Sequence, residues 1–223
     1  NMFFQAPEDY AQNYVIGSFL RILRFVNSLI TLLLPGFYIS ITTFHQEMIP
    51  TLLAISIIKS KSEVPFPTST SIIFMLLAFE VLIEAGFRLP RTFGQTISII
   101  GALVVGQAAV QAKIISPVVV IVIAVTGMAG FTMPNQDFAN ALRICRLLFV
   151  ICATIAGLYG LSLGLLILIY HLNTLETFGV PYFSPFVAND GREIIKDTII
   201  RVPLYLMKKR PVILKTTNKK RQK

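Results

Sequence analysis

The sequence predicts an all-α integral membrane protein, and three observations support this fold class. The 223 residues are 54% hydrophobic and their mean hydropathy is +0.71. Only 14% of them are charged, whereas a soluble domain carries about 25%. Several uncharged stretches reach the roughly 20 residues that a helix needs to cross a bilayer. These features exclude an ordinary water-soluble domain.

We expect three regions along the chain. Residues 1–24 predict an interfacial amphipathic helix, because Arg21 and Arg24 interrupt an apolar pattern that follows Pro7. Residues 25–171 predict a transmembrane domain, and residues 172–223 a basic cytoplasmic tail. The chain begins at Asn1 without a methionine, so we expect further sequence upstream.

Four uncharged segments within the transmembrane domain each predict a span: 25–44, 92–112, 114–136 and 147–170. The apolar stretch 48–58 is too short to cross and predicts a short helix, followed by a stiff corner at Val64-Pro65-Phe66-Pro67. Segment 68–87 is long enough to cross, but it carries two carboxylates, so its crossing stays open. The prediction is therefore four to five transmembrane helices plus interfacial helices.

The formal net charge of +9 lies entirely in residues 192–223, which hold eleven basic and two acidic residues. A basic segment after the last apolar span is typical of a cytoplasmic tail. Such a tail attracts anionic lipid by about 1 kcal/mol per basic residue near the surface. We expect no nucleic-acid partner, because no basic fold with aromatic platforms accompanies the tail.

No motif for catalysis is present, so we expect neither an enzyme nor a cofactor. His45 and His171 lie at span ends and are too isolated to predict a metal site. Cys145 and Cys152 are seven residues apart along one predicted helix and are expected to be buried thiols.

Glu80 and Glu84 are four residues apart, so they share one helix face. A carboxylate inside a membrane is costly, by roughly 2.5–3.5 kcal/mol, and usually faces protein or water. One interpretation is an acidic selectivity element beside a watery path. The other is that 68–87 skims the interface, with both acids in water or paired to Arg88 or Arg91.

A stripe of small or weakly polar residues follows one face of segment 92–112. Such a stripe favours either close helix packing or the lining of a pore. Its candidate pore-lining members are Gln95, Ser98, Ala102, Val105 and Ala109. Three glycines in the last span predict helix packing: Gly157, Gly160 and Gly164.

Ordered motifs from Pro7 to Pro203 carry a family resemblance. They are Pro7-Glu8-Asp9-Tyr10, Val64-Pro65-Phe66-Pro67, Glu84-Ala85-Gly86, Arg88-Leu89-Pro90, Gly94-Gln95-Thr96, Gly106-Gln107-Ala108-Ala109-Val110 and Pro181-Tyr182-Phe183-Ser184-Pro185. Together they resemble the membrane domain of the A subunit of GerA-type spore germinant receptors. Typical members also carry a soluble N-terminal domain ahead of the membrane part, and we expect none within these 223 residues.

The resemblance implies a role in nutrient-triggered germination at the inner membrane of the bacterial spore. It also implies a transporter-like B subunit and a lipoprotein C subunit as partners. Assembly as a ring, by resemblance a pentamer, would form a ligand-gated cation channel, with Val105 near a hydrophobic gate. Two other functions stay open from the residues alone: a non-conducting membrane scaffold and a secondary transporter subunit.

Overall fold

The computed structural model describes residues 3–88, 104–177, 180–182 and 200–203. A single 3-10 turn, η1 (Pro7–Tyr10), precedes the first long helix, α1 (Tyr14–Thr43). The helix α1 continues through residue 24, where the sequence analysis placed the end of an interfacial segment, and through Pro35. Gly36 follows that proline, and a Cβ there would lie 2.7 Å from Leu161 Cδ1, so the absence of a side chain permits close packing.

The connection from α1 to the next long helix has the form that the sequence predicted. It contains η2 (Gln46–Met48) and the short helix α2 (Thr51–Lys61). The proline corner comes next, and α3 (Thr68–Arg88) begins directly after it. The corner separates two helices because each proline fixes its own φ and restricts the residue before it.

The predicted span 114–136 is not one helix of that length. Residues 104–111 are helical, Lys113 has a φ of 57°, and the helix α5 (Pro117–Phe131) has only 15 residues. A proline suits the first turn of α5, and Pro134 opposes any continuation beyond its end. The Asn135 side chain then accepts hydrogen bonds from the N–H groups of Asp137 and Phe138, which caps the next helix.

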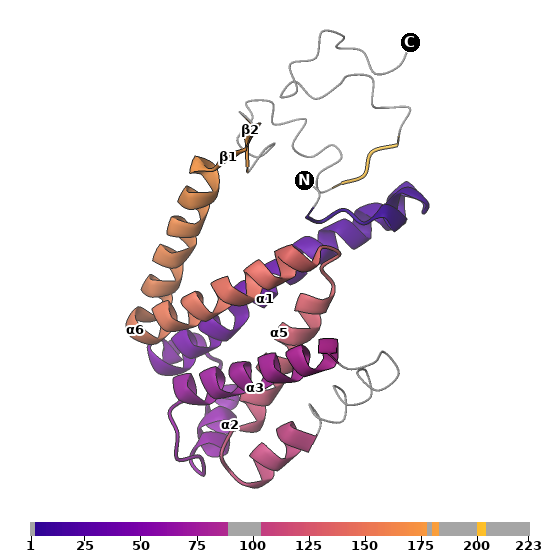
Figure 1. Cartoon of the computed structure of the whole chain (residues 1–223). Coiled ribbons are helices and arrows are strands. Elements are labelled where there is room, and N and C mark those ends of the chain that lie inside the picture. The colour runs from indigo at the N-terminus through magenta and orange to yellow at the C-terminus, as the bar shows by residue number, and fades with distance from the viewer. Residues whose placement is uncertain (1–2, 89–103, 178–179, 183–199, 204–223) are drawn as a thin grey trace, which may run out of the picture. The chain divides into compact units, whose positions relative to one another are not determined.

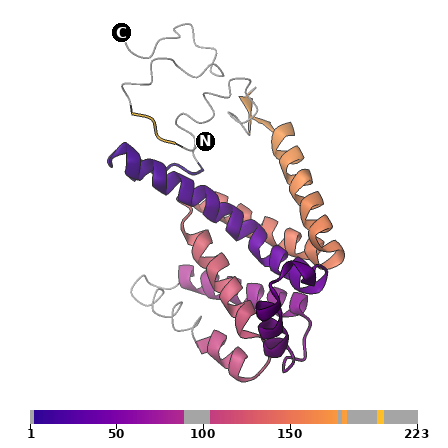
Figure 2. The same cartoon turned by 180° about the vertical axis from the view of Figure 1, so that it is seen from behind.

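The last helix, α6 (Gln136–Thr174), has 39 residues and is broken in its middle. At the break Ala156 has φ −130° and ψ 15°, and Gly157 has φ 58° and ψ −136°. The ribbon of α6 turns sharply there in both views (Figures 1 and 2). The uncharged run 147–170 predicts an unbroken span, and the break at Gly157 corrects that prediction. A positive φ is compatible with glycine because it has no Cβ.

Helices dominate the described residues, which confirms the predicted fold class. The only strands among them are β1 (Glu176–Thr177) and β2 (Val180–Pro181), paired antiparallel. Three described helices are long and apolar enough to cross a membrane: Tyr14–Thr43, Thr68–Gly86 and Gln136–Thr174. The segment 68–87, left open by the sequence, therefore meets the criteria, whereas α5 falls short of them.

The chain divides into two compact units. Unit 1 comprises residues 1–29, 129–142 and 165–223, and unit 2 comprises residues 30–128 and 143–164. The hydrophobic core of unit 2 gathers side chains from α1, α3, α5 and α6, with Ile115 just before α5. Its fully or almost fully buried members are Ile39, Ile72, Met75, Leu76, Ile115, Val119, Ile123, Val150 and Ala153.

Candidate functional site

Three charged side chains meet between α3 and α6 inside unit 2. Nη1 of Arg143 donates a hydrogen bond to Oε1 of Glu80 at 3.2 Å, and Nη2 of Arg146 lies 3.6 Å from Oε2. The two arginines are three residues apart on α6, so they project from one face of that helix. A carboxylate on one apolar helix is thus held by two guanidinium groups from another.

The burial of this cluster makes the ion pairing energetically important. Arg146 is 3% exposed, and its Nε has no hydrogen-bond partner among the residues that the structure describes. A buried guanidinium is costly unless an opposite charge compensates it. Glu80 supplies that charge, so the cluster joins α3 to α6 electrostatically.

The neighbouring residue, Phe79, explains how α3 comes close to α5. Its ring packs directly over Gly127, where a Cβ would lie under 3.0 Å from ring carbons. Real Cβ atoms essentially never make such contacts, so only glycine fits at this position without a shift. The glycine on α5 therefore helps to set the position of Glu80.

A second charged cluster lies in unit 1, around Asp9 of η1. The Asp9 side chain is fully buried, and its Oδ2 lies 2.7 Å from Arg24 Nη1 and 3.5 Å from Arg21 Nε. The Ala6 N–H donates to the same oxygen at 3.1 Å. Burial alone would raise the pKa of Asp9, but the hydrogen bonds from Arg24 and Ala6 and the charges of both arginines outweigh it. The pKa therefore lies below its ordinary value of 3.8.

Arg201, near the other end of the sequence, binds the same turn. Its Nη1 donates to the backbone oxygens of Asp9 and of Gln12, the latter at 2.9 Å, and its Nη2 donates to that of Tyr10 at 3.1 Å. Its guanidinium lies 5.2 Å from the centre of the Tyr10 ring, and its N–H donates to Ser18 Oγ at 3.0 Å. The N-terminal turn and residue 201 are thus held side by side in unit 1.

The family model described as Bacillus/Clostridium GerA spore germination protein matches residues 1–213. The chain belongs to the GerA family.

Curated relatives agree with this membership. The chain is 46% identical to spore germination protein KA of Bacillus subtilis (strain 168), over 99% of this chain and 40% of that protein. It is 45% identical to spore germination protein B1 of the same organism, over 94% of this chain and 43% of that protein. With spore germination protein GerLA of Bacillus cereus it shares 42% identity, over 96% of this chain and 43% of that protein. This GerA-family chain therefore spans less than half of these relatives. No solved structure matches it.

The predicted pore stripe of the GerA-family chain is described only at its C-terminal end. Gln95, Ser98 and Ala102 lie outside the described residues. Val105 is 37% exposed, whereas Ala109 packs against the core of unit 2. The stripe thus has one outward-facing and one inward-facing member within unit 2, and the pore-lining assignment stays a prediction.

The three predicted packing glycines lie at and after the break in α6. At Gly160, a Cβ would come under 3.0 Å from the backbone oxygen of Cys152, and at Gly157 it would meet the Phe44 ring at 2.9 Å. At Gly164 it would stand 3.4 Å from the Phe149 ring, which is ordinary contact. The approaches at Gly160 and Gly164 join the two parts of α6 on either side of the break, whereas Gly157 lies against Phe44, just after α1.

The two predicted acidic residues, Glu80 and Glu84, have different surroundings. Glu84 is exposed, whereas Glu80 is held by the arginines of α6. The sequence analysis considered Arg88 and Arg91 as partners; Arg91 and the Arg88 side chain lie outside what the structure describes. It missed Arg143, Arg146 and Arg201 as functional candidates. The spacing of Arg143 and Arg146 on one helix face was the available sign, and nothing in the sequence marked Arg201.

The GerA-family chain offers no evident metal centre in its described part. Among residues 3–88, 104–177, 180–182 and 200–203, no group of three or more His, Cys, Asp or Glu could hold a metal ion.

Proposed function

We propose that this chain is the membrane-embedded part of the A subunit of a spore nutrient germinant receptor. The observation that carries the proposal is the GerA family match over residues 1–213, on a chain whose described part holds three helices suited to cross a membrane. The partners in this proposal are a transporter-like B subunit and a lipoprotein C subunit in the inner spore membrane. The basic tail, residues 192–223, would lie on the cytoplasmic side against anionic lipid.

The chemical role that we propose is conduction of cations through a ring of copies, a pentamer by resemblance. Residues 104–111 present Ala109 to the core of unit 2 and leave Val105 on an exposed face, where it is free to face a central axis. A ring of valines would close such a path by excluding water. Exposed Glu84 is proposed for an acidic ring, because its side chain lies at the surface of unit 2, whereas Arg146, which pairs with Glu80, is buried.

Replacing Val105 with alanine or serine is expected to let cations leave spores without nutrient, because a smaller or polar group no longer excludes water at the gate. Ion release from dormant spores measures the effect. Val104→Ala is the matched control, since Val104 is the adjacent exposed valine on a different face. If dormant spores of both Val105 variants retain their ions, the result would argue for a non-conducting scaffold. Solute-coupled flux by reconstituted receptor would argue for a secondary transporter.

The contacts in unit 1 support a topology with both ends on one side of the membrane. The Phe3 ring lies 5.6 Å from the Tyr182 ring, and Arg201 binds the turn at Asp9 and Tyr10. The crossings between these segments must then be even in number. If α1, α3 and α6 each cross once, this proposed topology requires an odd number of crossings between α3 and α6, and only one of the predicted spans 92–112 and 114–136 would then cross.

Cysteine labelling tests this topology. In a Cys145→Ser and Cys152→Ser background, Glu8→Cys and Glu176→Cys are expected to react with a membrane-impermeant maleimide from one side only. Glu47→Cys, in the connection after α1, is expected to react from the opposite side, since one crossing separates it from Glu8. Reaction of Glu8→Cys and Glu176→Cys from opposite sides would overturn the even count.

A further inference from the structure

The connection between α1 and α3 contains an apolar helix that the described part of the chain leaves uncovered. None of the residues of α2 is buried, and Leu52, Ile55 and Ile58 are 84%, 62% and 62% exposed. Its 11 residues extend about 16 Å, roughly half the thickness of the hydrocarbon core. Because α2 joins two helices that are long enough to cross, it lies near one surface of the membrane, where it meets both acyl chains and headgroups.

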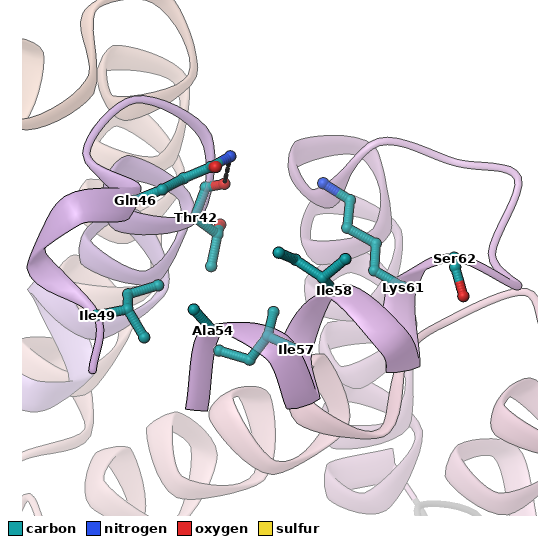
Figure 3. Close-up of a pocket in the computed structure, with 8 residues that line it drawn as sticks. All are labelled: Thr42, Gln46, Ile49, Ala54, Ile57, Ile58, Lys61 and Ser62. Carbon is teal, nitrogen blue, oxygen red and sulfur yellow. Dashed lines mark hydrogen bonds between the residues drawn. The ribbon is translucent and has the colours of Figure 1, made fainter. Parts of the chain in front are cut away.

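A pocket of about 260 Å³ opens between α2 and the end of α1. Ala54, Ile57 and Ile58 give it an apolar wall, while Thr42 and Gln46 form the opposite side (Figure 3). The Gln46 side chain donates to the Thr42 backbone oxygen at 3.1 Å, which helps to fix that side. The pocket is thus an apolar slot with a polar edge.

Lys61 is the one charged residue among those that line the pocket, and no carboxylate lines it. The nearby carboxylate of Glu63 is engaged by Lys113, with Nζ 3.1 Å from Oε2. No ion pair of Lys61 occurs within the described part of the chain, since its ammonium has no carboxylate within 4.0 Å there. An apolar slot with one uncompensated cation at its edge complements a molecule that has an anionic head and an apolar chain.

We propose that this pocket binds an anionic phospholipid, with its phosphate at the Lys61 ammonium and the first part of an acyl chain against Ile57 and Ile58. The location of α2 near the membrane surface supplies such lipids directly, and the charge of Lys61 selects them over zwitterionic ones. The proposal rests on the membrane location of the chain but not on conduction. Bound lipid would cover apolar surface of α2 and stabilise the connection between α1 and α3.

The test uses a tryptophan reporter, because the chain contains no tryptophan. Leu53→Trp places the reporter on α2 at an exposed apolar position outside the pocket lining. The protein is reconstituted in phosphatidylcholine vesicles that contain a minor fraction of brominated phosphatidylglycerol or brominated phosphatidylcholine. Quenching is expected to be stronger from the anionic brominated lipid. Lys61→Gln is expected to lower that preference about fivefold.

Two matched controls separate the pocket from general surface charge. Lys59→Gln removes a lysine from the same helix outside the pocket lining and is expected to retain most of the preference. Ala54→Phe fills the slot and is expected to abolish the preference with every charge intact, whereas Leu52→Phe on the exposed face is expected to keep it.

Three results would overturn the proposal. Equal losses from Lys59→Gln and Lys61→Gln would assign the preference to surface charge alone. Excess inorganic phosphate could abolish the preference for the anionic lipid while the Ala54→Phe variant retains that preference. This pair of results would assign the pocket to a free anion. Equal quenching by both brominated lipids in the Leu53→Trp protein without further substitutions would show that anionic lipid does not occupy the pocket, as when another protein segment covers α2.

Discussion

Glu80→Gln is expected to lower the free energy of unfolding by about 3 kcal/mol, because the change leaves a buried guanidinium without its counter-charge. Arg146 is only 3% exposed, and its Nη2 lies 3.6 Å from Glu80 Oε2. The partial exposure of the Glu80 side chain, 39%, places the loss at the lower end of the range for buried pairs. Titration of the detergent-solubilised protein with sodium dodecyl sulfate, followed by circular dichroism, measures it.

Glu84→Gln is the matched control, one helical turn away on the same face and exposed. Glu84→Gln is expected to lower the free energy of unfolding by less than about 1 kcal/mol, as for surface ion pairs. Adding Arg146→Met to Glu80→Gln is expected to recover part of the loss, because removal of both charges leaves less uncompensated charge. Equal losses from Glu80→Gln and Glu84→Gln, with no recovery in the double variant, would contradict a structural tie between α3 and α6.

The same pair of variants separates stability from selectivity. If Glu84 forms the acidic ring, Glu84→Gln changes the cation preference of the reconstituted receptor with little change in unfolding free energy. Glu80→Gln then acts chiefly on stability, because the Glu80 carboxylate pairs with arginines of α6.

Gly160→Ala is expected to lower the free energy of unfolding by about 2–3 kcal/mol, as overpacking does in a close-packed interior. The new Cβ would lie under 3.0 Å from the backbone oxygen of Cys152, and a backbone group cannot move aside as a side-chain end can. The part of α6 after the break would have to shift away from the part before it. The same detergent titration measures the loss.

Gly164→Ala provides the control within the same helix. Its Cβ would meet the Phe149 ring at 3.4 Å, which is ordinary contact. The expected change is small, because alanine also favours a helix over glycine by about 1 kcal/mol. A loss at Gly164 as large as that at Gly160 would contradict close approach at Gly160 as the cause and would indicate a general intolerance of side chains along this face.

Apolar runs and prolines in the sequence account for much of the fold. The long apolar runs predicted the membrane helices, and the Pro65–Pro67 corner predicted where α3 begins. Those inferences succeed because chain-local quantities decide them: the apolar length of a helix, and the backbone restriction that proline imposes. The family resemblance also follows from ordered motifs alone.

Residues that meet across long sequence separations were beyond such reasoning. The carboxylate of Glu80 could be recognised as costly, and the sequence offered Arg88 or Arg91 as partners, whose side chains lie outside the described residues. The pairing of Glu80 with Arg143 and Arg146 came from the structure. The break at Gly157 was hidden for a related reason: a glycine in an apolar helix is equally compatible with packing and with a positive φ.

What the sequence by itself determined is the membrane class of the chain, most of its helices and its GerA family. The tertiary structure alone decided that Glu80 pairs with α6, that α6 turns at Gly157, and that Arg201 binds the N-terminal turn. The physical reason is that apolar length and proline act within one segment. The compensation of a charge depends on which distant segments pack together.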